Sequence, residues 1–237
     1  VLDANGDRVV TLPNGVDTET FDPHRYPDAP FQGRGAALVF TGAMDYPPNI
    51  EAVIWFVHDV FPGIVAALPN AQFLIVGSKP TAQVRKLADH PGVTVTGRVE
   101  SVAAYLAHAE VAVAPLQIAR GIQNKVLEAM AMAMPLVVSR GALTGISAKP
   151  GIHLICVDTA QQWVDACVDL IRNREAASNL GRAARELVLT EYTWEAQFAR
   201  LDGLLGAADS PLRSMGKHEA RQVIGAGFGQ DRRESGL

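Results

Sequence analysis

Short apolar runs recur through the middle of the chain, and within them polar and apolar residues do not alternate. Each run has the length of a β-strand and is followed by a glycine, a proline or another small residue. Strands that are apolar on both faces are typical of a parallel sheet covered by helices on each side. We therefore predict strands at residues 37–41, 73–76, 93–95, 111–114, 136–139 and 153–157.

Helical patterns fill the intervals between these strands. The first is predicted to begin at Asn49, a favourable N-cap that follows two prolines, and to end at Pro62, with a short turn at 64–68 after it. Further helices are predicted at about 81–88, 101–107, 121–134, 160–173, 175–191 and 194–205. The alternation predicts an α/β fold: a doubly wound, Rossmann-like parallel sheet flanked by helices.

The two ends of the chain differ from this alternating centre. Residues 1–35 hold four of the 14 prolines and several turn signals, so we expect a linking segment there. Residues 36–206 are expected to form the α/β domain. Residues 207–237 are rich in Gly, Ser and Arg, which favours a mobile tail. Because the first residue is Val1 rather than Met, we expect the chain to begin inside a longer protein.

Composition narrows the function classes. The chain has 237 residues, of which 48% are hydrophobic, and this is enough for one core. A net charge of -4 gives no sign of nucleic-acid binding. We find no signal peptide and no apolar run of the roughly 18 residues that a transmembrane segment needs. Cys156 and Cys167 lack metal-ligand spacing, so we expect reduced thiols in a cytoplasmic protein and no metal site.

Candidate chemistry lies in the loops that follow the strands, because open α/β sheets bind ligands beyond the carboxyl ends of their strands. The first four such loops span residues 42–46, 77–79, 97–99 and 115–121, and three of them begin with or soon reach a glycine. Glycine permits close approach of a ligand to the backbone. None contains a P-loop or a Gly-x-Gly-x-x-Gly motif, so neither an NTPase nor a dinucleotide oxidoreductase is favoured.

The fourth loop places two cations, Arg120 and Lys125, at the start of the helix predicted at 121–134. A cation at a helix N-terminus is unfavourable by itself, but it becomes favourable when an anion docks there. A diphosphate is the obvious candidate. Glu128, one turn further along, is placed to accept hydrogen bonds from ribose hydroxyls.

Simpler interpretations stand beside these. Lys125 and Glu128 are three residues apart and could form an ordinary surface ion pair, and Arg98 could be an ordinary surface residue. The sequence presents no Ser/His/Asp or Cys/His nucleophile arrangement and no carboxylate pair for acid–base catalysis. Turn-shaping, packing or surface roles are open for Asp45, Tyr46, His58 and His108.

Several motifs occur in a fixed order. They are Pro13-Asn14-Gly15-Val16-Asp17, Phe21-Asp22-Pro23, Phe40-Thr41-Gly42, Leu74-Ile75-Val76-Gly77, Val93 to Val99, Val111 to Pro115, Asn124 to Ala131, Met134 to Val138 and Tyr192-Thr193-Trp194. This ordered set, over about residues 12–206, resembles the C-terminal donor-binding half of retaining family-four glycosyltransferases, which have the GT-B fold. The runs from Gly42 to Asn49 and from Gly121 to Lys125 are similar to the exopolysaccharide and PEP-CTERM-associated branch.

The resemblance implies a role for each matching position. Glu128 matches the glutamate that binds the donor ribose. Arg98 and Val99 fall in the loop that cradles the base, and Gly42 falls at the glycine that lets the donor phosphates approach the first strand. The positions implied to meet the diphosphate and the sugar are Gly121, Ile122 and Asn124.

Two positions depart from the family pattern. Arg120 stands where the family usually has a glutamate, eight residues before Glu128, and residues 43–48 lack the usual arginine and lysine. We infer that Lys125, with Arg120, supplies the phosphate cations instead, and that Lys125 stabilises the leaving group. These departures leave the donor sugar open.

The resemblance implies transfer of a hexose from a nucleoside diphosphate sugar to a sugar or glycan acceptor, with retention and without cofactor or metal. The acceptor would bind through a missing N-terminal domain, so we expect the chain alone to bind nucleotide without turnover. We expect a bacterial cytoplasmic location, peripheral at the inner membrane through the missing half. Two alternatives stay open: a non-catalytic nucleotide-sugar-binding module, which Arg120 favours, and a non-hydrolysing nucleotide-sugar epimerase.

Overall fold

The computed structural model describes residues 12–32, 36–118 and 121–205. The chain divides into two units, and the first, Pro13–Trp194, holds the whole sheet. Residues Glu195–Leu205 of helix α8 (Trp194–Leu205) belong to the second unit. The predicted tail at 207–237 lies outside the described residues, and the predicted boundary after residue 35 stays a prediction.

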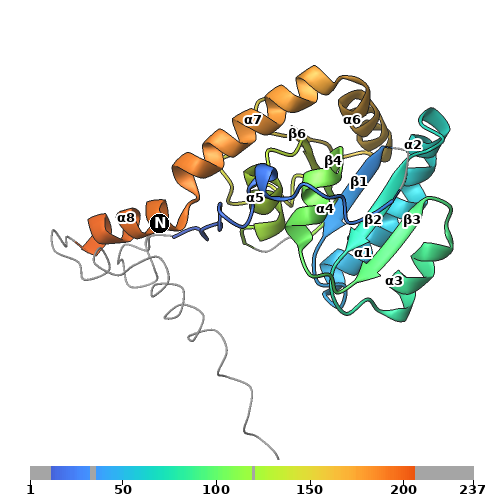
Figure 1. Ribbon diagram of the computed structural model, residues 1–237, viewed down its shortest axis with the longest axis horizontal. Helices are drawn as coiled ribbons and strands as arrows, with labels where there is room; N and C mark the ends of the chain where they lie inside the picture. Colours follow the sequence, from blue (N-terminus) through green and yellow to red (C-terminus); the bar gives the residue numbers. More distant parts are fainter. Residues whose placement is uncertain (1–11, 33–35, 119–120, 206–237) are drawn as a thin grey trace, which may run out of the picture. The chain divides into compact units, whose positions relative to one another are not determined.

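Six parallel strands form one sheet in the order β3-β2-β1-β4-β5-β6 (Figure 1). The strands are β1 (Ala37–Thr41), β2 (Gln72–Val76), β3 (Val93–Gly97), β4 (Val111–Ala114), β5 (Leu136–Val138) and β6 (Ile155–Cys156). This confirms the predicted doubly wound parallel sheet. The chain runs outward from β1 to β3 and then crosses back to β4, so the loops after β1 and β4 turn away from each other. Ligand crevices in such sheets lie at this switch point.

Helices cover both faces of the sheet (Figure 1). Side chains of Thr81, Ser101 and Thr159 cap three of them by accepting backbone N–H hydrogen bonds. The helices of the first unit are η1 (Pro23–Arg25), α1 (Pro47–Trp55), the π-helical η2 (Phe56–Val60), α2 (Phe61–Ala67), α3 (Ala82–Lys86), η3 (Leu87–Asp89), α4 (Val102–His108), α5 (Asn124–Ala131), α6 (Ala160–Arg172) and α7 (Arg174–Glu191).

The first helix differs from the prediction at both ends. It begins at Pro47, with Tyr46 in the N-cap position, so Asn49 lies inside the first turn and is not the cap. It also continues past Pro62. The Phe61 N–H donates to the carbonyl of Phe56, five residues back, and this π-type turn lets Pro62 become a first-turn residue of α2, where a missing N–H costs little.

The same continuous helix, Pro47–Ala67, is long and apolar enough to cross a membrane by length and composition alone. This finding differs from the expectation that no segment is apolar enough to span a membrane. In this fold the helix connects β1 to β2, and its apolar stripe packs in the core through Ala52, Val53, Phe56, Val60 and Ile64, each fully buried. Core packing therefore explains its apolar character.

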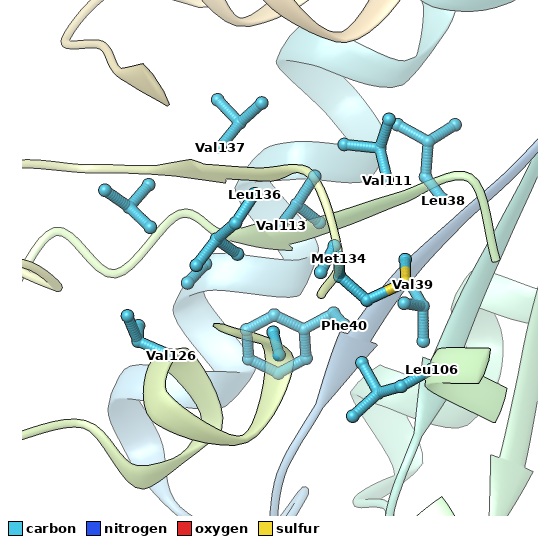
Figure 2. Close-up of a cluster of buried hydrophobic side chains, with 14 of the residues drawn as sticks. Leu38, Val39, Phe40, Leu106, Val111, Val113, Val126, Met134, Leu136 and Val137 are labelled. Atoms are coloured by element: carbon cyan, nitrogen blue, oxygen red, sulfur yellow. The ribbon is translucent and has the colours of Figure 1, made fainter. Parts of the chain in front are cut away.

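The core beneath the sheet's carboxyl edge joins strands β1 and β4 to two helices. Figure 2 shows Phe40 of β1 near Val126 of α5, with Leu106 of α4 in the same cluster. All three side chains are at most 1% exposed. The predicted sheet-facing stripe of α5, which includes Leu127 and Met130, is buried as well. The position of α5 relative to β1 is therefore set by close packing.

Strand β3 carries one irregularity. Its pairing with β2 runs regularly to Ile75 and Val95, and then skips a residue, so that Val76 pairs with Gly97. Thr96 is the extra residue, and its hydroxyl donates to the carbonyl of Gly97 at 2.9 Å. Gly97 has a φ of 71°, a conformation that favours glycine. The loop after β3 therefore begins one residue later than it would after a regular strand.

The leading segment, defined here as Pro13–Gln32, is fastened to the domain by Arg185 of α7. The guanidinium donates to the carbonyls of Phe21 (3.0 Å) and Ala131, and it forms an ion pair with Asp22 at 3.3 Å. At the other end of α5, the side chain of Asn14 donates to that of Asn124 at 2.9 Å. The leading segment is therefore bonded directly to the first residue of α5 and linked through Arg185 to its last residue.

Replacing Arg185 with alanine is expected to lower the free energy of unfolding by about 2–3 kcal/mol, because two half-buried carbonyls lose a charged donor. Urea unfolding measures this loss. Arg182, one turn earlier on α7, is exposed and donates to the Asn179 side chain, so Arg182→Ala should cost less than about 0.5 kcal/mol. Equal losses in the two variants would contradict the role given to Arg185.

Candidate functional site

A cleft of about 820 Å³ opens beyond the carboxyl ends of β1, β2 and β3 and the N-terminus of α5. Its volume is in the range of small-molecule and cofactor sites. The residues that line it are Phe21, Thr41, Gly42, Ala43, Tyr46, Asn49, Gly77, Ser78, Lys79, Arg98, Val99, Val102, Ile122, Gln123, Asn124, Lys125 and Glu128.

The floor of the cleft is backbone from the loops after β1 and β2. The Gly42 N–H donates to Val76 O at 3.0 Å and the Met44 N–H donates to Ser78 O at 2.8 Å, so pairing continues past the strand ends. A Cβ on Gly77 would overlap the carbonyl oxygen of Gly42. A Cβ on Gly42 would lie 2.7 Å from Asn49 Nδ2 and 3.0 Å from Lys125 Nζ. Both positions therefore require glycine.

Lys125 reaches the cleft from the first turn of α5. Its Nζ donates a hydrogen bond to Asn49 Oδ1 and lies 4.2 Å from the centroid of the Phe40 ring. Within the described residues, the backbone N–H groups of Asn124 and Lys125 have no hydrogen-bond acceptor, as expected for the first turn of a helix. An ammonium and free N–H groups therefore come from the same helical turn beside the cleft, an arrangement that suits an anion.

Burial shapes the charges at this site. It lowers the pKa of the Lys125 ammonium from 10.5 to about 7, and the neighbouring Glu128 carboxylate opposes this only in part. Burial also raises the pKa of the Glu128 carboxyl, against the effect of Lys125. Within the described residues, Lys125 and Glu128 do not approach within ion-pair distance. The simple ion-pair interpretation is therefore wrong, and both groups face the cleft.

Most of the predicted donor-binding residues meet in this one cleft. The structure brings together Gly42, Arg98, Val99, Ile122, Asn124, Lys125 and Glu128. Two predicted residues are not among them: Gly121 does not line the cleft, and Arg120 lies outside the described residues. What each residue binds stays a prediction.

Helix α5 begins at Asn124, three residues later than predicted. Gly121 has a φ of 68°, which is outside the helical range, and Gln123 is extended in the N-cap position. The Gln123 side chain donates to Gly121 O at 3.2 Å and holds this turn. The later start places Lys125 in the first helical turn, next to the free N–H groups.

Several cleft residues are not among those predicted from the sequence, and Asn49 and Lys79 matter most. The sequence predicts Asn49 as a helix cap, although it ends the run from Gly42 to Asn49 that carries part of the family resemblance. Lys79 belongs to one of the candidate loops; it has a φ of 54° and forms an ion pair with Asp45 at 3.3 Å. The position of Lys79 in the loop directly after β2 is the sequence feature that could have identified it as a cleft residue. The further lining residues not predicted are Phe21, Thr41, Ala43, Tyr46, Gly77, Ser78, Val102 and Gln123.

The remaining candidates lie elsewhere. His58 packs edge-on against His90, and His108 hydrogen-bonds with Tyr26 O at 2.9 Å, so both have structural roles outside the cleft. Cys167 is buried, whereas Cys156 is half-buried, and both are free thiols. Among the described residues, no group of three or more His, Cys, Asp or Glu side chains could hold a metal ion.

Comparison with known proteins gives a consistent result. The family described as "Glycosyl transferases group 1" matches residues 35–173. The chain is 27% identical over 205 residues to the phosphatidyl-myo-inositol mannosyltransferase of Mycobacterium leprae, covering 81% of this chain and 52% of that protein. It is also 27% identical over 215 residues to a GDP-mannose-dependent monoacylated alpha-(1-6)-phosphatidylinositol monomannoside mannosyltransferase of Corynebacterium glutamicum, covering 82% and 55%.

Among solved structures, the C-terminal domain of a glycosyl transferase group 1 family protein (LpcC) from Francisella tularensis is similar, with a TM-score of 0.59 and 16% identity. The match covers 76% of this chain and 100% of that domain, which confirms the predicted C-terminal half of a GT-B fold. The chain spans about half the length of these two curated relatives.

Proposed function

The chain belongs to the group 1 glycosyltransferases, and we propose that it is the donor-binding half of a retaining hexosyltransferase that uses a nucleoside diphosphate sugar. One observation carries this proposal. A single cleft at the switch point of the sheet joins the N-terminus of α5, the ammonium of Lys125, the carboxyl of Glu128 and a glycine floor. The helix N-terminus and the ammonium would bind an anion, and the carboxyl would accept hydrogen bonds from a ribose. The glycine floor would let phosphates approach closely.

The chemical task of this half is to stabilise the leaving diphosphate. As the bond from the anomeric carbon to the phosphate oxygen breaks, negative charge grows on the diphosphate, and donors that are already in place lower the barrier. The free N–H groups of Asn124 and Lys125 and the Lys125 ammonium would serve as those donors. The diphosphate itself would accept the proton of the attacking hydroxyl, so this half needs no nucleophile of its own.

The relatives suggest which donor to test first. Both are mannosyltransferases and one is named as GDP-mannose-dependent, so GDP-mannose is the leading candidate. For the acceptor we propose a sugar or glycan of exopolysaccharide or cell-surface glycan synthesis, bound through a further domain. The reaction would take place in the cytoplasm at the inner membrane face. The run from Gly42 to Asn49 supports the exopolysaccharide branch.

Nucleotide titration by calorimetry tests the site. We expect one of GDP, UDP or ADP to bind at micromolar strength, and Glu128→Ala to weaken that binding by about 1–3 kcal/mol, because ribose hydroxyls lose an acceptor. Glu51→Ala, which removes an exposed carboxylate on α1 outside the cleft, should leave affinity unchanged. If Glu128→Ala bound as tightly as wild type, Glu128 would not be a ribose ligand.

Turnover separates the proposal from its alternatives. With GDP-mannose and acceptor, this chain alone should release no diphosphate, whereas a longer protein that contains it should do so only when acceptor is present. Acceptor-dependent release excludes an epimerase, and any turnover excludes a non-catalytic module. Sugar transfer by this chain alone would show that its acceptor site is not in another domain.

A further inference from the structure

Asn49 is a buried polar residue that the proposed reaction leaves without a role. Its side chain is 5% exposed and lies in the first turn of α1. It does not cap the helix, because Tyr46 occupies the N-cap position and no side-chain cap bond is made. The amide instead lies in the wall of the donor cleft and makes two hydrogen bonds with other parts of the chain.

Those two bonds fix the orientation of the amide. Nδ2 donates to the carbonyl of Ala43 at 2.8 Å, and Oδ1 accepts from the ammonium of Lys125. A carbonyl can only accept and an ammonium can only donate, so a flipped amide would lose both bonds. The Ala43 carbonyl belongs to the loop after β1, which is itself paired with the loop after β2 through Met44. Asn49 therefore links the cleft floor to the lysine.

Lys125 has few other constraints on its long side chain. Phe40 supports the ammonium from one side, and Gly42 leaves room for it. The charged or titratable groups that face the same cleft are Glu128 on α5, Tyr46 after β1, Lys79 after β2 and Arg98 after β3. None of these four is an ion-pair or hydrogen-bond partner of Lys125 among the described residues. The Asn49 oxygen is the polar contact that holds the ammonium.

We propose that Asn49 is a positioning residue, which holds the Lys125 ammonium at the cleft floor for the phosphate groups of a nucleoside diphosphate. This inference rests on the proposed function. The amide is suited to the task because it is neutral: it orients the ammonium without neutralising the charge. An aspartate at this position would form an ion pair with Lys125 and would compete with the phosphates.

The pairing is tested first in the protein without ligand. In a chain with 13Cε-labelled lysines, the signal missing from Lys125→Met identifies Lys125, and its titration midpoint should lie near pH 7. In Asn49→Asp the midpoint should rise by at least about one pH unit, because a carboxylate then faces the ammonium. Asn179→Asp, which adds the same charge at an exposed position on α7, should leave it unchanged. An unchanged midpoint in Asn49→Asp would overturn the pairing.

A double-mutant cycle then tests whether Asn49 acts through Lys125. Asn49→Ala should weaken binding of the preferred nucleoside diphosphate roughly 10-fold in the wild-type background, and less than about 2-fold in Lys125→Met. Equal weakening in both backgrounds would overturn the positioning role, since Asn49 would then act by another route. If Asn49→Ala fails to fold, the uncharged and similarly sized Asn49→Leu replaces it in the cycle, with the same coupling expected.

The two experiments distinguish a failure of the proposed function from a failure of the positioning role. If no nucleoside diphosphate binds the wild-type chain, the proposed function fails, while the titration of Lys125 still decides whether Asn49 and the lysine are paired. If nucleotide binds but the cycle shows no coupling, the proposed function stands and the positioning role falls.

Discussion

Replacing Lys125 with methionine is expected to weaken nucleotide binding and to stabilise the fold at the same time. Loss of a charged donor to the diphosphate should cost about 1.5–3 kcal/mol of binding, which is roughly 10- to 150-fold in Kd. Methionine has a similar length and would pack against the Phe40 ring without a charge. It removes the cost of a desolvated ammonium, which outweighs the loss of the donor to Asn49 Oδ1. The free energy of unfolding at pH 7 should therefore rise by about 1–2 kcal/mol.

The stabilisation should depend on pH in a defined direction. The pKa of Lys125 is about 7 in the folded protein and 10.5 in the unfolded chain, so between these values the unfolded chain binds more protons. Wild-type stability at this site therefore rises with pH from about 7 to 10.5, as the buried ammonium loses its proton. The advantage of Lys125→Met should be greatest below pH 7 and should shrink as the pH rises toward 10.5.

Urea unfolding at pH 6.5 and 9, together with nucleotide titration, measures both effects. Lys86→Met, an exposed lysine on α3 away from the cleft, serves as the matched control and should change neither quantity appreciably. A Lys125→Met variant that bound nucleotide weakly and was also less stable than wild type would mean that the lysine contributes to packing. The free energy of unfolding would then depend little on the desolvation of the Lys125 ammonium.

Gly77→Ala is expected to cause the largest loss of stability, about 2–4 kcal/mol, because the new Cβ would overlap the carbonyl oxygen of Gly42. The backbone cannot rotate the clash away, since the Gly42 N–H is bonded to Val76 O. The floor of the cleft would have to shift, so nucleotide affinity should fall as well. Urea unfolding and calorimetry measure the two losses.

Gly97→Ala is the matched control for this substitution. Gly97 has a φ of 71° but no atom within 4 Å of the position where a Cβ would lie. Alanine there should cost about 1–2 kcal/mol for the backbone conformation alone. A loss in Gly77→Ala no greater than that in Gly97→Ala would show that the two loops can separate without penalty. The floor would then be adaptable.

The sequence predicts the sheet well because its strands are apolar on both faces, a pattern that few other folds produce. Strands β1 and β4 have the predicted bounds, and each of the other four overlaps its predicted range. Lys125 and Glu128 were found because they stand three residues apart near the start of a predicted helix, and this spacing is visible in the sequence. Residues that act through a local departure from regular structure were harder to predict. Helix α5 starts late because of the backbone conformation of Gly121, which no periodicity reveals.

Asn49 shows most clearly what sequence could not supply. Asparagine after two prolines is a strong N-cap signal, and the prolines were expected to precede the helix, yet they form its first turn. Because the Asn49 side chain does not cap the helix, it accepts a hydrogen bond from Lys125, 76 residues further along the chain. Contacts of this separation depend on how α1 and α5 pack across β1, and a single sequence carries no sign of that. The same holds for Arg185 and Phe21.

The extra residue in β3 changes the path by which the chain reaches the cleft wall. The pairing with β2 skips Thr96 and resumes at Gly97, and a bulge of this kind bends the strand and increases its twist. Arg98 and Val99 line the cleft in the register that includes this insertion. Deleting Thr96 would keep the Val76–Gly97 pair but remove the bend, and so redirect these two residues without replacing either. The direction in which the chain enters the cleft therefore depends on a residue that does not line it.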